Sequence, residues 1–300
     1  MEEAQVHHLR VSPAGPDGDG TLSVVPNAKG MSDEEMRELA LSYGHISGFV
    51  FPTREGSDLD YEIRIWHPYY ELEKCAHAMI GTVWLLSKLG MMPRDDLRIV
   101  TKIGRIEARI TKTADNTDST NDGIWVEFSN PTCSVMDNMD KKHADAILSG
   151  LDISRDDIVP GAAIQNAGTN KMVKTLVPIE SIAKLHDLEV EYNLVKKLLG
   201  KIKSNGLCLY AIANHERQDG HWEDTATALA FGMLINELVD NPHGTLKIRQ
   251  VWNQDRHREI SLRFRKWGSS VDGCWIGGTA KFETEKRETG KTGTWETDTE

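Results

Sequence analysis

Two segments half a chain apart each predict a helix that is buried on all sides. The first covers residues 75–89 and the second 225–238, and both open with small and polar residues before becoming almost wholly apolar. A helix that is apolar on every face must be surrounded by protein. We therefore predict a duplicated architecture in which each half rolls a sheet around a central helix. Two unrelated buried helices, both rich in alanine, are the alternative.

The segments around these helices predict a mixed α/β (α+β) chain. Ser32 and Glu35 form a capping-box pattern, which predicts a helix that ends near Tyr43, and 179–199 holds further helical segments. Apolar or alternating runs predict strands at 48–51, 61–66, 97–110 (a hairpin), 124–128, 172–178, 207–213, 245–251, 259–264 and 273–282. Residues 12–20 and 114–122 have the composition of loops.

We divide the chain into an N-terminal half at 1–130, a C-terminal half at 131–283 and a tail at 284–300. The tail is composed mainly of Glu, Thr, Lys and Gly. It lacks the apolar surface needed to fold, so we expect it to be disordered.

Composition excludes several classes of partner. The net charge of −11 argues against nucleic acid or an anionic membrane. The four cysteines, Cys75, Cys133, Cys208 and Cys274, form no metal-type pair, so we expect free thiols. The N-terminus has no signal-peptide pattern, and no apolar run reaches the ~20 residues that span a bilayer. We expect a cytoplasmic protein.

The starts of the two buried helices are the first place to look for a site. A helix N-terminus offers unpaired N–H groups and the positive end of a dipole. Two such ends that face one cleft could bind a carboxylate. The polar residues at these starts are Cys75, His77, Glu223, Asp224, Thr225 and Thr227.

Four stretches carry a resemblance to a known family. In the first, a predicted strand ends at Pro68 and leads to the helix start Cys75-Ala76-His77-Ala78. The stretches are 64–78, 223–230, 244–250 and 275–280. In this order they resemble the PhzF-like (phenazine biosynthesis-like) isomerase family from about residue 20 to residue 283. The resemblance implies a diaminopimelate epimerase-like fold of two pseudo-symmetric halves, each a rolled mixed sheet around a central helix.

The resemblance also implies a mechanism without cofactor or metal. In the family one glutamate moves a proton, a histidine and an aspartate assist, and a serine with backbone N–H groups holds the substrate carboxylate. The histidine matches His77 and the aspartate matches Asp224. Ile46 stands in the place of the glutamate and Leu229 in that of the serine. Isoleucine cannot move a proton, so we do not expect the parent reaction by the parent mechanism.

Two further histidines stand where the family usually has serine and threonine. An imidazole titrates near neutral pH, so we expect His45 or His67, with His77 and Asp224, to transfer the proton. The alternative is that each is a surface or hydrogen-bonded histidine. Zinc bound by three histidines is another alternative, but their spacing is not that of a metal motif, and we predict no metal and no cofactor. The residues expected to contact the substrate are Cys75, Ala76, Ser47, Trp66, Thr225, Thr227 and Trp222.

These observations favour an enzyme that acts on a small molecule, in secondary metabolism, by isomerisation, cyclisation, dehydration or epimerisation. Fold-related racemases use a cysteine at this helix start, so a Cys75/Thr225 epimerase is a second hypothesis. A non-catalytic small-molecule-binding or scaffolding protein that kept the fold is a third. Dimers are common in the family, so a homodimer is a further expectation.

Overall fold

A computed structural model describes residues 5–11, 20–73, 75–112, 123–129, 134–168, 173–188, 192–213, 217–221, 241–253, 256–267 and 270–283. Four sequence predictions concern segments that lie wholly or mostly outside these ranges. They are the loops at 12–20 and 114–122, the second central helix at 225–238 and the tail at 284–300.

The first half alternates strands with two helices. The elements are β1 (His7–Val11), β2 (Thr21–Val25), α1 (Asp33–Tyr43), β3 (Ser47–Pro52), β4 (Tyr61–His67), β5 (Tyr70–Leu72), α2 (Ala76–Lys88), β6 (Asp96–Thr101), β7 (Gly104–Lys112) and β8 (Ile124–Ser129). The predicted capping box begins α1: Ser32 accepts from the Glu35 amide, and the Glu35 carboxylate accepts from the Ser32 amide.

The second half carries short helices and then long strands. The elements are β9 (Ser134–Asn138), α3 (Lys141–Gly150), η1 (Arg155–Asp157), β10 (Gln165–Gly168), β11 (Val173–Pro178), α4 (Ile182–His186), α5 (Tyr192–Ile202), β12 (Leu207–Ala213), β13 (Arg217–His221), β14 (His243–Asn253), β15 (Arg256–Trp267), β16 (Ser270–Gly278) and β17 (Ala280–Phe282). The sequence patterns did not indicate α3 or the strands β1, β2, β5, β9, β10 and β13.

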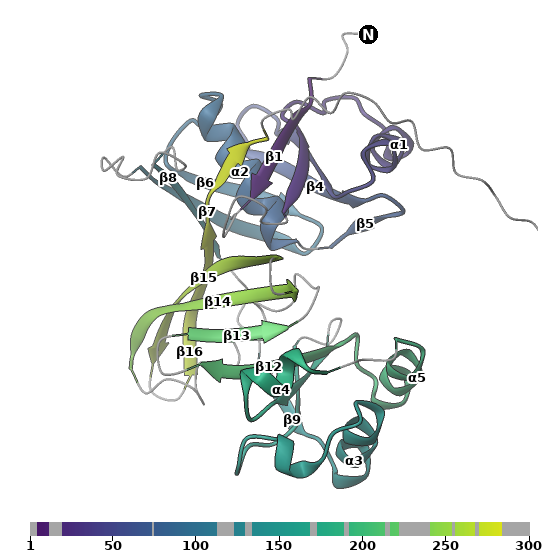
Figure 1. Cartoon of the computed structure of the whole chain (residues 1–300). Coiled ribbons are helices and arrows are strands. Elements are labelled where there is room, and N and C mark those ends of the chain that lie inside the picture. The colour runs from purple at the N-terminus through teal and green to yellow at the C-terminus, as the bar shows by residue number, and fades with distance from the viewer. Residues whose placement is uncertain are drawn as a thin grey trace, which may run out of the picture.

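All the strands of the described ranges join one mixed sheet, which agrees with the predicted α+β class. Figure 1 shows the first half, in purple and blue, above the second half, in teal and green. The chain then returns to the first half, because β16 pairs with β8 and β17 pairs with β1. β17 therefore completes the sheet of the first half, although the predicted boundary assigned it to the second.

The predicted central helix of the first half is confirmed as α2. Every residue from Ala76 to Leu86 is buried. The helix packs in one core with strands from both halves, including Leu22 of β2, Phe128 of β8 and Ile276 of β16. The sheet therefore packs around α2, the helix at whose start the sequence predicted a site.

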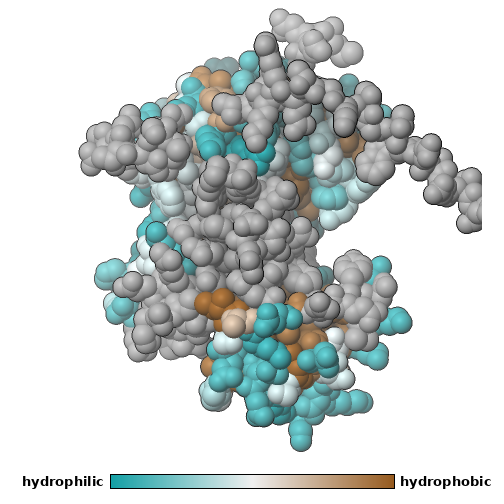
Figure 2. All heavy atoms as spheres, in the orientation of Figure 1, coloured by the Kyte–Doolittle hydropathy of each residue, from teal (hydrophilic) through white to brown (hydrophobic). Residues whose placement is uncertain are grey.

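The outer faces of the sheet carry the other helices. α1 covers a small cluster in the first half that contains Val25, Phe49 and Trp66. The helices α3, α4 and α5 cover β11 and β12 in the second. Figure 2 shows a largely hydrophilic surface over these second-half helices, interrupted by small apolar patches.

Two further observations concern membrane-spanning helices and the cysteines. Within the ranges given above, no helix is long and apolar enough to cross a membrane. Cys75, Cys208 and Cys274 are buried and form no disulfide bond.

Candidate functional site

The N-terminus of α2 brings together three of the predicted site residues. Cys75 is the N-cap residue and has extended backbone angles, but its side chain makes no capping hydrogen bond. Instead its Sγ lies 3.2 Å from Nδ1 of His77. Cys75 and Ala76 are almost fully buried, and His77 is 9% exposed. A thiol and an imidazole are therefore in contact in the first turn of a buried helix.

Ile46, at the position of the family glutamate, belongs to the same environment. It is partly buried and packs against the core cluster that contains Cys75 and Ala76. Its carbonyl accepts from the backbone N–H of Ser23 at 3.3 Å. An isoleucine side chain offers no titratable atom here, so any acid or base at this site must come from another residue.

His45 lies in a different group of residues. Its Nε2 is 2.8 Å from Oγ of Ser23, and the same Oγ is 2.9 Å from Nδ1 of His8. Leu22 and Val24 of β2 face the core cluster on which Ile46 packs, so Ser23 between them faces the opposite side of the sheet, and His45 lies on that side with it. Burial, and then the nearby His8, lower the pKa of His45, while Glu283 and a hydrogen bond to the Tyr43 backbone oppose this shift. The structure does not bring His45 to His77.

Ser47 and Trp66 lie on the same outer face as His45. Ser47 pairs with Ser23 across the parallel strands β2 and β3, and with Trp66 across β3 and β4. Trp66 packs in the cluster under α1. These two predicted substrate contacts therefore face α1 rather than the N-terminus of α2.

His67 lies at the tip of the hairpin formed by β4 and β5. Its ring stacks on Tyr70 at 4.8 Å between centroids, and its Nδ1 accepts from the Tyr69 amide at 3.4 Å. Tyr69 and Tyr70 are 72% and 55% exposed. Its neighbours are therefore surface aromatic residues, which agrees with the surface alternative stated for it above.

The remaining predicted site residues are Trp222, Asp224, Thr225 and Thr227, and they lie outside the described residues. Their roles stay predictions. Among the residues that the structure describes, no group of three or more His, Cys, Asp or Glu side chains could hold a metal ion.

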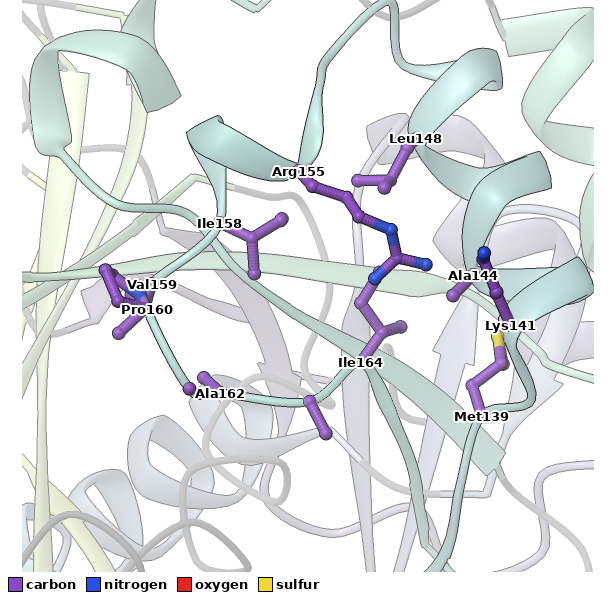
Figure 3. Close-up of a pocket in the computed structure, with 12 residues that line it drawn as sticks. Met139, Lys141, Ala144, Leu148, Arg155, Ile158, Val159, Pro160, Ala162 and Ile164 are labelled. Atoms are coloured by element: carbon purple, nitrogen blue, oxygen red, sulfur yellow. The ribbon is translucent and has the colours of Figure 1, made fainter.

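A cavity of about 640 Å³ lies elsewhere, between α3 and the segment that leads into β10. Its walls are mainly apolar, and Figure 3 shows Arg155 reaching across it toward α3. Arg155 also pairs with Asp145 of α3 at 2.6 Å. None of the predicted site residues lines this cavity, and the sequence signal nearest to it is the turn composition of 160–163. The lining residues are Met139, Lys141, Ala144, Leu148, Arg155, Ile158, Val159, Pro160, Gly161, Ala162, Ala163 and Ile164.

Sequence reasoning also missed His8 and Ser23. The only signal for them was a histidine pair, His7-His8, ahead of a loop. The partner of His8 lies 15 residues away along the chain, so only the pairing of β1 with β2 brings the two together.

Comparison with known proteins decides the family. Residues 17–233 match the family described as phenazine biosynthesis-like protein (PhzC-PhzF). The chain belongs to the PhzC-PhzF family. The Escherichia coli K12 protein named uncharacterized isomerase YddE is 24% identical over 84% of this chain and 86% of its own length.

Solved structures share the fold. A Bacillus anthracis phenazine biosynthesis protein of the PhzF family has a TM-score of 0.76 at 18% identity, covering 95% of this chain and 98% of its own. An Agrobacterium vitis hydroxyproline epimerase with bound trans-4-hydroxy-L-proline has a TM-score of 0.57 at 13% identity, covering 95% and 92%. Together the family and these relatives support an isomerase-like enzyme for this PhzC-PhzF chain.

Proposed function

We propose that this PhzC-PhzF protein is a cofactor-independent isomerase that moves a proton on a small molecule at the N-terminus of α2. The observation that carries the proposal is the contact of 3.2 Å between Sγ of Cys75 and Nδ1 of His77. The family mechanism needs a group that moves a proton, and Ile46 cannot supply it. Cys75, whose thiol contacts the imidazole of His77, belongs to the core cluster on which Ile46 packs.

Each member of the pair has a chemical role that its position favours. The positive end of a helix stabilises a thiolate, so a cysteine at a helix N-terminus is ionised, and therefore able to accept a proton, at a lower pH than a free thiol. His77 is in hydrogen-bond contact with this sulfur and can take up or return a proton. The amide groups of a helix start can hold the carboxylate or enolate oxygen that becomes more negative as a proton leaves carbon.

Asp224 stays in the proposal as the second acid–base residue, and Thr225 and Thr227 as substrate contacts. This assignment rests on the resemblance of 223–230 to the family motif. The reaction classes that need only such proton movement are isomerisation, ring closure, dehydration and epimerisation.

Two other functions have an observation in their favour. A Cys75/Thr225 epimerase is favoured by the place of Cys75 at the N-cap, where its thiol can act as a base on one face of a stereocentre. A non-catalytic binding protein is favoured by Ile46, which replaces the family's proton-moving group. The experiment below separates these functions.

The test is exchange of substrate hydrogen in D₂O. A panel of small carboxylic acids and amino acids is first screened for binding by ligand-detected NMR, and each binder is then incubated with enzyme and followed for loss of carbon-bound ¹H. We expect exchange with wild type, loss of exchange in His77→Asn, and a large reduction in Cys75→Ala. His143→Asn is the matched control, because His143 is exposed and paired with Asp140 on α3.

The outcomes distinguish the three functions. Hydrogen exchange that is as fast in His77→Asn as in wild type contradicts the proposal. Exchange with inversion at one stereocentre that is abolished by Cys75→Ala and by Thr225→Val supports the epimerase. Ligands that bind tightly but never exchange a hydrogen support the binding protein.

A further inference from the structure

The cavity beside α3 is a hollow in the core of the second half. Its volume of about 640 Å³ is that of a small-molecule site. Three of its lining residues, Ala144, Leu148 and Ile164, are buried members of the cluster that the second-half helices form with β11 and β12. They make an apolar floor, so a ligand that fills the cavity gains by burying apolar atoms against them.

The wall opposite α3 is a turn whose shape is set by its sequence. The amide of Ala162 donates to the carbonyl of Val159 at 3.0 Å, which closes a four-residue turn. Pro160 and Gly161 occupy its two central positions, and Gly161 has a φ of +80°. Proline followed by a glycine with positive φ is the sequence that a type II turn requires. This part of the wall is therefore fixed by local chemistry.

The backbone also holds both ends of this wall. The amide of Val159 donates to the carbonyl of Pro178 at 3.0 Å, next to β11. At the other end, the carbonyl of Ile164 accepts from the amide of Met139 at 2.9 Å, just ahead of α3. The cavity is therefore already formed in the free protein, and a ligand need not order its wall on binding.

The charged groups of the cavity lie at its mouth. Lys141 and Arg155 are both exposed, and they are the two ionisable residues among the lining residues that the structure describes. Arg155 donates from a terminal nitrogen to Asp145 of α3 at 2.6 Å, and Figure 3 shows its guanidinium between η1 and α3. A guanidinium has five N–H donors, so this pair leaves donors for a ligand.

The charges at the mouth favour a ligand with one negative charge. Arg155 and Lys141 carry one positive charge each and Asp145 carries one negative charge, so one positive charge remains. The carboxylate of Asp140 is turned to the helix start, where it accepts from the amide of His143 at 2.9 Å and lies 2.7 Å from its ring. A single carboxylate balances the remaining charge, and its two oxygens fit the planar donors of an arginine.

We propose that this cavity is a second ligand site, for a small molecule with an apolar body and one carboxylate that Arg155 binds at the mouth. None of its lining residues belongs to the candidate site at the start of α2, and Figure 1 shows α2 and α3 in opposite halves of the molecule. The site is therefore independent of the proposed function, and its test does not use proton exchange.

The test is binding of octanoate and hydrocinnamate to the full chain, followed by methyl NMR of protein labelled at isoleucine and leucine. Each acid is compared with its uncharged primary amide, which has the same apolar body. We expect both acids to shift the methyl signals of Leu148 and Ile164 in a saturable way. The amides should bind about tenfold to a hundredfold more weakly, because they lack the charge that strengthens hydrogen bonds from Arg155.

Three variants make the test specific. Arg155→Met removes the donors but keeps an apolar stem, so the affinity for each acid should fall to that for its amide. Arg105→Met is the matched control, because Arg105 also forms an exposed pair at 2.6 Å, with Asp58 of the first half. Both pairs are exposed, so both variants should stay folded. Ala162→Trp fills the cavity from an exposed position in its wall and should abolish binding of acids and amides.

Four results would overturn the proposal. The first is that neither acid shifts the signals of Leu148 and Ile164 in wild type. The second is an affinity for the acids that equals that for the amides or is unchanged in Arg155→Met. The third is that the same shifts persist in folded Ala162→Trp. The fourth is loss of the shifts in His77→Asn, which would place the acids at the start of α2 instead.

Discussion

Gly81, in the middle of α2, offers a sharp test of how closely the sheet surrounds this helix. Replacing glycine by alanine in a helix interior normally stabilises a protein by about 1 kcal/mol, because alanine loses less conformational freedom on folding. At Gly81 an added Cβ would lie 2.5 Å from Cδ2 of Leu22 and 2.7 Å from Cγ2 of Val11. Real Cβ atoms do not approach other atoms this closely, so the strands or the helix must shift.

The size of the effect follows from these two contacts. Leu22 and Val11 are both fully buried, on β2 and β1, and valine is stiff at χ1, so neither methyl group can turn into free space. Overpacking of this kind costs about 1–3 kcal/mol. After the gain in helix propensity, we expect Gly81→Ala to lose up to about 2 kcal/mol of unfolding free energy, or a few degrees in melting temperature.

Gly200 on α5 is the matched control. It is also helical, but nothing lies within 4 Å of its added Cβ, so Gly200→Ala should be neutral or stabilising by up to about 1 kcal/mol. Thermal and urea unfolding of both variants measure the difference in sign. In the double variant Gly81→Ala/Val11→Ala the loss should be smaller than the sum of the single losses, because the new methyl group fills the space that Val11 leaves. Stabilisation by Gly81→Ala equal to that by Gly200→Ala would refute close packing of α2 against β1 and β2.

Three further outcomes can be measured by thermal or urea unfolding. Ser32→Ala removes the side-chain acceptor of the Glu35 amide and should lose about 1 kcal/mol; an unchanged melting temperature would contradict the cap. Glu127→Gln weakens the pair with Arg263 at 2.8 Å, which is partly exposed, and should cost only about 0–1 kcal/mol, less in high salt; a large loss that salt does not change would contradict this. The folded pKa of His45 is below 6.5, so unfolding takes up a proton at acidic pH: the contribution of His45 to stability should be constant above pH 6.5 and fall below it, and the fall in stability between pH 6.5 and 5 should be smaller in His45→Gln.

The fold could be predicted well where the signal is local. The Ser32 capping box is contained in four consecutive residues, and α1 begins there. The apolar run at 75–89 predicted a surrounded helix, and every residue of α2 from Ala76 to Leu86 is buried. Both features depend on neighbours in sequence, so no knowledge of distant pairing was needed.

Strands that depend on distant partners were harder to predict. β1 has only five residues, and its pairing with β17 joins Leu9 to Phe282 across almost the whole chain. Because β17 pairs with β1, it lies in the sheet of the first half. Composition and periodicity contain no information on which edges meet, so the division at residue 131 separated strands that the sheet joins.

The candidate site shows why an alignment can name the right segment and still group its residues wrongly. The segment 45–47 was selected because it aligns with the family's glutamate motif, and Ile46 does pack in the same core as Cys75. In β2, Leu22 and Val24 face this core, and Ser23 between them faces the other side of the sheet. His45 and Ser47 therefore lie on the side of Ser23, where His45 bonds to the Ser23 hydroxyl and Ser47 is its cross-strand neighbour.

The placement of His45 and Ile46 on opposite sides of the sheet also limits which residue can have replaced the lost glutamate as the group that moves the proton. A residue that restores proton transfer must reach the face on which Ile46 lies, and a histidine one position earlier cannot do so without leaving Ser23. The helix start is different, because Cys75 and His77 are held by α2 and are in contact at 3.2 Å. Ile46→Glu should therefore introduce a carboxylate into the environment of this pair, with a raised pKa because it is partly buried. If His77 is the group that moves the proton, this variant should shift the pH profile of hydrogen exchange in D₂O, whereas His45→Glu should not; equal profiles for the two variants would show that the two faces are not separate.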